Sequence, residues 1–193
     1  MLSHREAVDL LAGEDLLGLG MAADAVRRRL HPGDVVSYII DRNINYTNIC
    51  TSACAFCAFY RPVGHPDGYV ISQEELFSKI EETLALGGTG ILMQGGLHPD
   101  LSIEWHEQLL RSIKKRFNIH LHCYSAPEIV HLARTSHLTI AETIARLRDA
   151  GLDSIPGGGA EILDDQVRGR VSPRKCSTGE WAEVHRTAHR LGA

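Results

Sequence analysis

The chain has 193 residues, a hydrophobic content of 44%, a charged content of 23% and a formal net charge of −4. This length predicts one domain with a sizeable core, and the composition is ordinary for a soluble globular protein. The negative net charge does not indicate the basic surface of a nucleic-acid-binding protein. No apolar run approaches the ~20 residues of a membrane span, and the N-terminus lacks the apolar h-region of a secretory signal. We therefore expect a protein of the reducing cytoplasm without nucleic-acid partners.

Two helical patterns and then a β-branched segment open the chain. Apolar residues recur at helical spacing over residues 4–12 and 15–29, and residues 31–34 read H-P-G-D, a helix stop signal. We expect residues 1–34 to form a helical cap on the outside of the main fold. Residues 35–40 predict a preliminary strand, and residues 43–49 predict the first strand of the main fold.

From residue 72 onward, predicted helices alternate with predicted strands. Helices are expected over 72–86 and 102–117, from 127, over 139–150, and from a cap at Ser177 or Thr178 nearly to the chain end. Strands are expected over 90–94, 119–125 and 152–155. This alternation favours an α/β fold with a parallel sheet over residues 35–193.

Three cysteines lie close together in the loop after the first strand. Cys50, Cys54 and Cys57 have the spacing C-x3-C-x2-C, and Phe56 directly precedes the third cysteine. Thiolates select iron–sulfur clusters, zinc and copper(I) over hard cations. A 4Fe–4S cluster held by only three protein ligands keeps one iron open, and an open iron can bind a small molecule.

Other uses of the cysteines stay open at this point. A structural zinc site needs a fourth ligand, which His65 offers eight residues after Cys57. Disulfides are disfavoured, because five cysteines are an odd number and no secretory signal precedes them. Cys123 is expected to be a core thiol, and Cys176 a residue at a helix start rather than a fourth cluster ligand.

The cysteine spacing with its preceding aromatic resembles the radical S-adenosylmethionine (radical SAM) superfamily. The resemblance implies an enzyme with a 4Fe–4S cluster on Cys50, Cys54 and Cys57, and Phe56 near the cofactor. It implies SAM bound at the open iron, cleaved to a 5′-deoxyadenosyl radical, and an electron donor such as flavodoxin or ferredoxin. It also implies a TIM-type (β/α) barrel. Because a complete eight-unit barrel takes ~250 residues, we expect about four βα units that form the N-terminal part of one and lack its C-terminal half.

Two glycine-rich loops follow predicted strands, where such barrels carry their working residues. The resemblance assigns the turn Gly95–Gly96 to the amino group of SAM, although Gln94 and Leu97 depart from the Gly-Gly-Glu ending of the family. Three glycines at 157–159 precede Glu161, whose carboxylate is expected to accept hydrogen bonds from ligand hydroxyls. The alternative for both loops is a turn that needs glycine for its geometry alone.

The loop after the third strand, residues 120–128, carries further candidates. Alternation places His120, His122 and Tyr124 on one face of the strand. Ser125 and Glu128, at the end of the strand, are expected to reach ribose hydroxyls. A structural role for each histidine is the alternative.

Five segments together resemble the cyclic dehypoxanthine futalosine synthase branch of the superfamily. They are N-I-N-Y-T-N-I-C, C-A-F-Y-R, M-Q-G-G-L-H-P, H-L-H-C-Y-S-A-P-E-I and D-S-I-P-G-G-G-A-E-I-L. The resemblance implies ring closure of dehypoxanthine futalosine in menaquinone biosynthesis, beginning with loss of the ribose C4′ hydrogen and ending with loss of an electron and a proton. His98, His122 and Tyr124 are positional candidates for the proton acceptor, and none is assigned. Aminofutalosine synthase and the deazaflavin F0 synthase subunits are sister alternatives, and a non-enzymatic zinc- or cluster-binding half-barrel is an alternative of another class.

Overall fold

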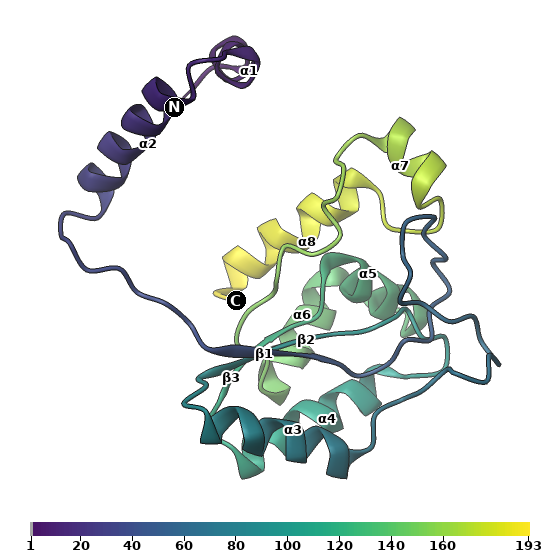
Figure 1. The fold of residues 1–193 in the computed structure, drawn as a ribbon. Coiled ribbons are helices and arrows are strands. Elements are labelled where there is room, and N and C mark those ends of the chain that lie inside the picture. The colour runs from purple at the N-terminus through teal and green to yellow at the C-terminus, as the bar shows by residue number, and fades with distance from the viewer. Residues whose placement is uncertain (1) are drawn as a thin grey trace. The chain divides into compact units, whose positions relative to one another are not determined.

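A computed structural model describes residues 2–193, which divide into two compact units at Tyr38 and Ile39. The first unit contains the helices α1 (His4–Ala12) and α2 (Leu16–Leu30), labelled in Figure 1. At the start of α1, the Ser3 hydroxyl accepts the N–H of Glu6, and the Glu6 carboxylate accepts the N–H of Ser3. Both predicted helices are confirmed, and the packing of this segment as a cap stays a prediction.

The second unit, Ile39–Ala193, is built on a parallel sheet. Its strands β1 (Asp41–Asn45), β2 (Gly90–Gln94) and β3 (His120–Cys123) lie in the order β1-β2-β3 (Figure 1). Ile44 lies opposite Met93, and Met93 lies opposite Cys123. All three side chains are buried, so the hydrophobic core lies against the face of the sheet that they share.

Helices pack around the sheet. Buried apolar side chains come from α3 (Gln73–Ala85), α4 (Ile103–Arg116), α5 (Ala126–Thr135), α6 (Ile140–Ala150) and α8 (Thr178–Leu191), while the short α7 (Asp165–Val171) buries Arg168. Helix α3 contacts β1, and α6 contacts α4, α5 and α8. Leu76, Ile80, Leu110, Ile113 and Ile129 are fully buried in the core, and each such side chain contributes roughly 1.5–3 kcal/mol.

The helix starts follow the predicted caps. The hydroxyls of Ser72, Thr139 and Ser177 each accept a backbone N–H from the residue three positions on. At α3 the Glu75 carboxylate pairs with Lys79 at 3.1 Å and returns no bond to Ser72. No helix among residues 2–193 is long and apolar enough to cross a membrane.

The prediction of a strand over 35–40 is wrong. Val35 and Val36 are 91% and 85% exposed, and the first strand begins at Asp41. A strand forms only where a neighbouring strand satisfies its main-chain groups. In residues 35–40 a bond to the neighbouring strand forms only at the last residue, where the Ile40 carbonyl accepts from the Thr89 N–H at 3.1 Å. The first strand also ends sooner than predicted, because Thr47 already pairs with Val70 in the antiparallel sense.

The predicted fourth strand, 152–155, is reduced to a parallel bridge between His122 and Ser154. The Asp153 carboxylate accepts the N–H of Leu121 at 2.7 Å, in the place of a main-chain carbonyl of the fourth strand. Pro156 has no N–H with which to continue the pairing. Helix α7 is not predicted by the sequence, because its 7 residues make fewer than two turns and give no hydrophobic period. The α/β class and the parallel sheet are confirmed.

Candidate active site

A cavity of about 310 Å³ lies at the carboxyl ends of the strands. Four segments far apart in the sequence meet there: the cysteine loop (48–61), the turn after β2, the start of α5 and the glycine-rich loop (156–162). Sequence analysis singled out all four. The lining residues are Asn45, Asn48, Cys50, Ser52, Cys54, Phe56, Cys57, Phe59, Tyr60, Gln94, Gly95, Gly96, Leu97, Ser125, Pro127, Glu128, Gly158, Gly159, Glu161 and Lys175.

The cysteine loop is closed by main-chain hydrogen bonds. The N–H of Cys50 donates to the carbonyl of Arg61 at 3.0 Å, and the N–H of Arg61 donates to the carbonyl of Asn48 at 2.8 Å. Inside the loop, Ala53 has a φ of 48°, a left-handed conformation that is uncommon for a residue other than glycine. The sharp turn at Ala53 lets Cys50 and Cys54 line one cavity, which Cys57 lines as well.

The cysteine loop and the turn after β2 form one backbone unit. The N–H of Gly96 donates to the carbonyl of Thr47 at 2.9 Å, and the N–H of Thr51 donates to the carbonyl of Leu97 at 3.1 Å. These bonds join main-chain atoms, and the Thr51 hydroxyl adds a further bond to the Leu97 carbonyl at 3.1 Å.

Glycine is required at both positions of this turn. A Cβ on Gly95 would lie 2.5 Å from the ring of Tyr46, and a Cβ on Gly96 would lie 2.2 Å from the carbonyl oxygen of Ile49. The turn therefore packs directly beneath the chain that carries the cysteines. The contact of Gly95 and Gly96 with the amino group of SAM stays a prediction.

The buried carboxylate of Glu128 accepts hydrogen bonds from three segments of the chain. Its Oε1 accepts from the Tyr46 hydroxyl at 2.7 Å and the Gly95 N–H at 2.9 Å, and its Oε2 accepts from the N–H and hydroxyl of Ser125 at 2.7 and 2.5 Å. Burial raises the pKa of Glu128 above the ordinary carboxyl value, while these bonds act in the opposite direction. Both carboxylate oxygens are thus engaged within the protein, and contact of Ser125 or Glu128 with ribose hydroxyls stays a prediction.

The glycine-rich loop forms the opposite wall. Glu161 accepts a hydrogen bond from Lys175 Nζ at 2.7 Å, and that Nζ lies 5.4 Å from the centre of the Phe56 ring. Burial opposes ionisation of Glu161, yet its bond with Lys175 brings the pKa of this carboxyl below the usual value. Gly159, with a φ of 88°, brings the main chain against Pro127. Binding of ligand hydroxyls by Glu161 stays a prediction.

The three candidates for the proton acceptor lie outside the residues that line the cavity. Tyr124 is fully buried, with its hydroxyl 3.3 Å from Nδ1 of His106. The predicted shared face of His122 and Tyr124 is wrong, because a φ of 61° at Tyr124 breaks the strand alternation. His122 Nδ1 lies 2.6 Å from the Ser154 hydroxyl, and burial lowers the pKa of His122 and of His98.

The remaining cysteines and His65 also lie apart from the lining. Cys123 is fully buried, as expected of a core thiol, and Cys176 is 3% exposed and directly precedes the cap of α8. His65 Nδ1 accepts the N–H of Asp67 at 3.1 Å. The zinc ligand set that includes His65 is not assembled, since no three His, Cys, Asp or Glu side chains in residues 2–193 gather around one position for a metal ion.

The cysteine loop fits a thiolate-ligated iron–sulfur cluster. In a 4Fe–4S cluster each cysteine binds a different iron, so the thiols need to face one cavity and need not meet at a single ion. The N–H of Ser52 lies 3.4 Å from Cys50 Sγ, and the Ser52 hydroxyl lies 3.3 Å from Cys54 Sγ. Hydrogen bonds to ligating sulfurs are among the features that set the potential of such clusters.

Sequence analysis missed several residues of this site. Asn45, Asn48, Gln94 and Lys175 line the cavity without being predicted. Gln94 directly precedes the predicted Gly95 and Asn48 lies two residues before Cys50, so their position was a usable signal, whereas Asn45 falls inside the strand predicted over 43–49. For Lys175 the sequence carries no such signal, because its place in the cavity depends on helix α7, which the sequence does not predict.

Comparison with known proteins identifies the family. The sequence profile of the Radical SAM superfamily matches residues 44–193. The chain is 44% identical over 192 residues to a cyclic dehypoxanthine futalosine synthase from Halalkalibacterium halodurans, covering 99% of this chain and 52% of that protein. It is 43% identical over 194 residues to a 5-amino-6-(D-ribitylamino)uracil–L-tyrosine 4-hydroxyphenyl transferase from Methanothermobacter thermautotrophicus, covering 99% of this chain and 53% of that protein.

A solved structure shows the same fold. Methylornithine synthase aligns with a TM-score of 0.73 at 16% identity, over 100% of this chain and 53% of that chain. The predicted partial (β/α) barrel is confirmed by this likeness, and the chain spans about half the length of the relatives that it matches. On the match over residues 44–193, the chain belongs to the radical SAM superfamily of enzymes.

Proposed function

We propose that the protein binds a 4Fe–4S cluster through Cys50, Cys54 and Cys57, binds SAM in the adjoining cavity, and converts dehypoxanthine futalosine to cyclic dehypoxanthine futalosine. One observation carries the cofactor part: the three cysteines line the same cavity as the glycine turn after β2 and the glycine-rich loop. The 44% identity to a synthase named for this product supports the substrate. A cavity of about 310 Å³ lies at the small end of the roughly 300–1,000 Å³ typical of ligand sites.

When bound, the cluster and SAM supply a 5′-deoxyadenosyl radical. The chain's own residues bind and orient. The N–H groups of Gly95 and Gly96 are already bonded to Glu128 and to the Thr47 carbonyl, so this turn offers carbonyl oxygen to the amino group of SAM. Glu161 and the Ser125 hydroxyl offer oxygens to ligand hydroxyls. We place the reaction in the cytoplasm, with flavodoxin or ferredoxin as the class of electron donor.

A second candidate reaction is favoured by one observation. The chain is 43% identical over 194 residues to the 4-hydroxyphenyl transferase named for 5-amino-6-(D-ribitylamino)uracil and L-tyrosine, which nearly equals its identity to the synthase. The two candidates call for different substrates and different bond changes: ring closure within one molecule in the first, and transfer of a 4-hydroxyphenyl group between two molecules in the second.

The test separates these reactions. Full-length protein, reconstituted with iron and sulfide under anaerobic conditions, is incubated with SAM, a reductant and either dehypoxanthine futalosine or the ribitylaminouracil with L-tyrosine. We expect 5′-deoxyadenosine and a cyclised product by mass spectrometry with the first substrate only. Product from the second pair alone would assign the transferase reaction instead.

The cluster assignment has its own test. Cys57→Ala should abolish 4Fe–4S reconstitution and SAM cleavage, because it removes one of the three thiolates. Cys123→Ala and Cys176→Ala serve as controls, since neither thiol lines the cavity, and both should keep the iron content of the parent protein. Equal loss of the cluster in Cys176→Ala would contradict the assignment, because four protein ligands leave no iron open to SAM.

A further inference from the structure

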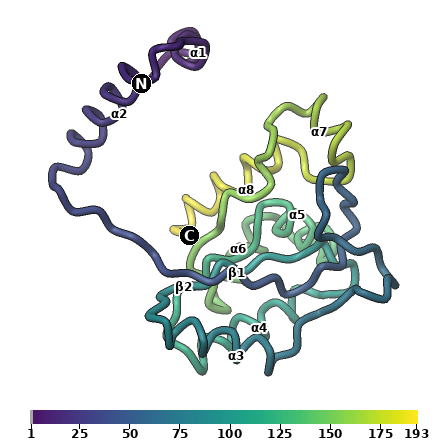
Figure 2. Tube along the Cα trace, viewed as in Figure 1, coloured from purple at the N-terminus to yellow at the C-terminus, as the bar shows by residue number. Residues whose placement is uncertain are grey.

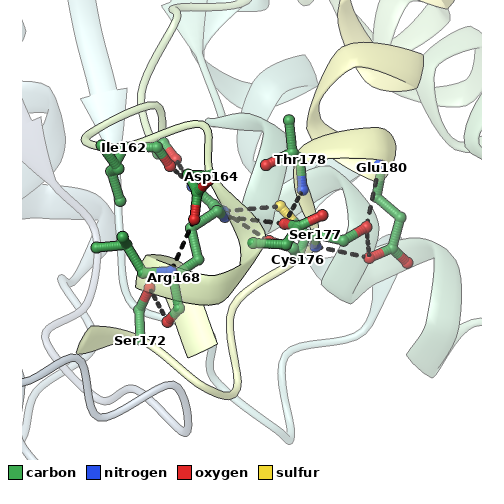
Figure 3. Close-up of polar contacts among 11 residues, drawn as sticks. Ile162, Asp164, Arg168, Ser172, Cys176, Ser177, Thr178 and Glu180 are labelled. Carbon is green, nitrogen blue, oxygen red and sulfur yellow. Dashed lines mark hydrogen bonds and ion pairs between the residues drawn. The ribbon is translucent and has the colours of Figure 1, made fainter. Parts of the chain in front are cut away.

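A buried guanidinium lies behind the glycine-rich wall of the cavity. Arg168, on α7, is 3% exposed (Figure 3). Its Nη1 donates to the carbonyls of Gly159 at 2.8 Å and Ile162 at 2.9 Å, and its Nη2 donates to the carbonyl of Cys176 at 2.6 Å. One side chain therefore joins α7 to the glycine-rich loop and to the segment that leads into α8.

Carbonyl oxygens are the main partners of this charge. The nearest carboxylate is that of Asp165, 3.9 Å from Arg168 Nε and 60% exposed, and Nε itself has no hydrogen-bond partner. A buried charge is costly unless it is hydrogen-bonded. Because the planar fork of an arginine fixes the directions of its donors, the three carbonyls can accept only from a narrow range of positions.

The anchored carbonyls belong to segments that face the cavity. Gly159 lines it, and Glu161 lies between the two loop carbonyls that Arg168 holds. Cys176 directly follows Lys175, which pairs with Glu161 at 2.7 Å. Both members of this ion pair are thus fixed by the same guanidinium, from the side away from the cavity.

The helix that carries Arg168 also contacts the cysteine loop. The N–H of Ala55 donates to the carbonyl of Val171, the last residue of α7, at 2.8 Å, and Figure 2 shows the segment between β1 and α3 running beside α7. Helix α7 therefore contacts the loop with the cysteines and, through Arg168, the loop with Glu161. A shift of α7 would change the distance between these two loops.

We propose that Arg168 is a positioning residue: it holds the glycine-rich loop and Lys175 at the separation from the cysteine loop that SAM requires. Arg168 does not line the cavity and acts through the main chain of the loop. The inference rests on the proposed function insofar as SAM is the ligand.

The test compares Arg168→Gln with Arg170→Gln in the full-length, cluster-loaded protein. Arg170 is exposed on the same helix, so its substitution removes an equal charge without touching the loop. In Arg168→Gln we expect amide hydrogen exchange over residues 168–175, where the N–H groups of Arg168, Ser172 and Lys175 are hydrogen-bonded, to rise about tenfold or more. We expect the Kd for SAM to rise about tenfold, because the loop carbonyls lose their bonds to a charged donor. Exchange over residues 90–97 and iron content should match the parent, and Arg170→Gln should match it throughout.

Three results would overturn the proposal. One is parent-like exchange and SAM affinity in Arg168→Gln. Another is faster exchange spread evenly over the sheet, or loss of iron, either of which would make Arg168 a general support of the fold. If Arg168→Gln does not fold, Arg168→Lys, which keeps the charge without the planar fork, is compared with Arg170→Lys. Equal exchange over residues 168–175 in these two variants is the third overturning result. A parent protein that binds no SAM would refute the proposed function, while the exchange comparison would still decide the role of Arg168.

Discussion

Two buried ions of opposite sign hold the two walls of the cavity. On the wall formed by the cysteine loop, the turn after β2 and α5, the Glu128 carboxylate accepts from N–H and O–H donors. On the wall formed by residues 156–176, the Arg168 guanidinium donates to main-chain carbonyls. Each of these two groups makes its hydrogen bonds within the protein. The walls therefore differ in the sign of the group that holds them, but in both walls the buried group fixes the loops. The thiols, the glycine main chain and the more exposed Glu161 remain to contact a ligand.

The largest expected effect comes from removing the anionic anchor. Glu128→Ala leaves the buried hydroxyl of Tyr46 and the N–H groups of Gly95 and Ser125 without an acceptor, so we expect a loss of about 4 kcal/mol in the free energy of unfolding. Glu142 is the matched control, since it closes the same kind of capping box with Thr139 on an exposed turn, and Glu142→Ala should cost clearly less. Urea unfolding measures both. Equal losses would mean that Glu128 is no more than a helix cap.

A smaller effect separates the glycines of the two walls. Gly96→Ala forces a Cβ against the Ile49 carbonyl at 2.2 Å, so main chain must shift, and we expect a loss of about 2–3 kcal/mol. A Cβ on Gly157, in the opposite wall, meets nothing within 4 Å. Gly157→Ala should change the free energy of unfolding by less than about 0.5 kcal/mol. A tolerant Gly96 would show that the turn is not packed under the cysteine loop.

Acid should weaken the Glu128 wall through His106, which lies beside Tyr124. Burial lowers the pKa of His106 from 6.5 to about 3. Between these pH values the histidine is protonated in the unfolded chain and neutral in the folded chain, so stability is lost as pH falls from about 6.5 toward 3. His106 should lower the free energy of unfolding by about 2 kcal/mol between pH 7 and pH 5.

The variant His106→Phe keeps an aromatic ring and should remove that share of the acid sensitivity. The parent protein, measured by urea unfolding over the same pH range, is the reference for this comparison. An unaltered pH slope in His106→Phe would show that His106 is already protonated in the folded protein.

The smallest effect on stability is expected from the ion pair that faces the cavity. Lys175→Met removes the partner of Glu161, whose side chain is 42% exposed, so the free energy of unfolding should fall by about 0.5 kcal/mol. Lys79→Met, which breaks a similar pair with Glu75 on α3, should cost the same. Affinity for SAM, measured by calorimetry, should fall in Lys175→Met only. A loss of stability as large as that of Glu128→Ala would place Lys175 among the anchors.

What the sequence could predict follows the same division. Cys50, Cys54 and Cys57 are recognisable because their chemistry depends on spacing within one loop. The glycine turn and the caps at Thr139 and Ser177 are equally local, since each is completed within a few residues. For such features, a short stretch of chain carries the whole physical requirement.

Features that depend on distant partners could not be predicted. Residues 35–40 have strand-forming side chains and lack a neighbouring strand, and residues 152–155 lose their ladder to the carboxylate of Asp153. The turn at Tyr124 reverses the side chain that alternation would place beside His122. Arg168 is the extreme case, because its partners are carbonyl groups, which every residue has and no sequence pattern marks.

The main-chain bonds between the cysteine loop and the turn after β2 have a consequence for how this loop can vary. Thr51 and Gly96 are joined to Leu97 and Thr47 through N–H and carbonyl groups, and the Thr51 hydroxyl adds one bond to the Leu97 carbonyl. A substitution between the cysteines leaves the main-chain bonds in place, whereas one inserted residue shifts every donor past its acceptor. We therefore expect the loop to tolerate replacement of side chains that face neither the cavity nor the cysteine sulfurs, and to tolerate no insertion or deletion.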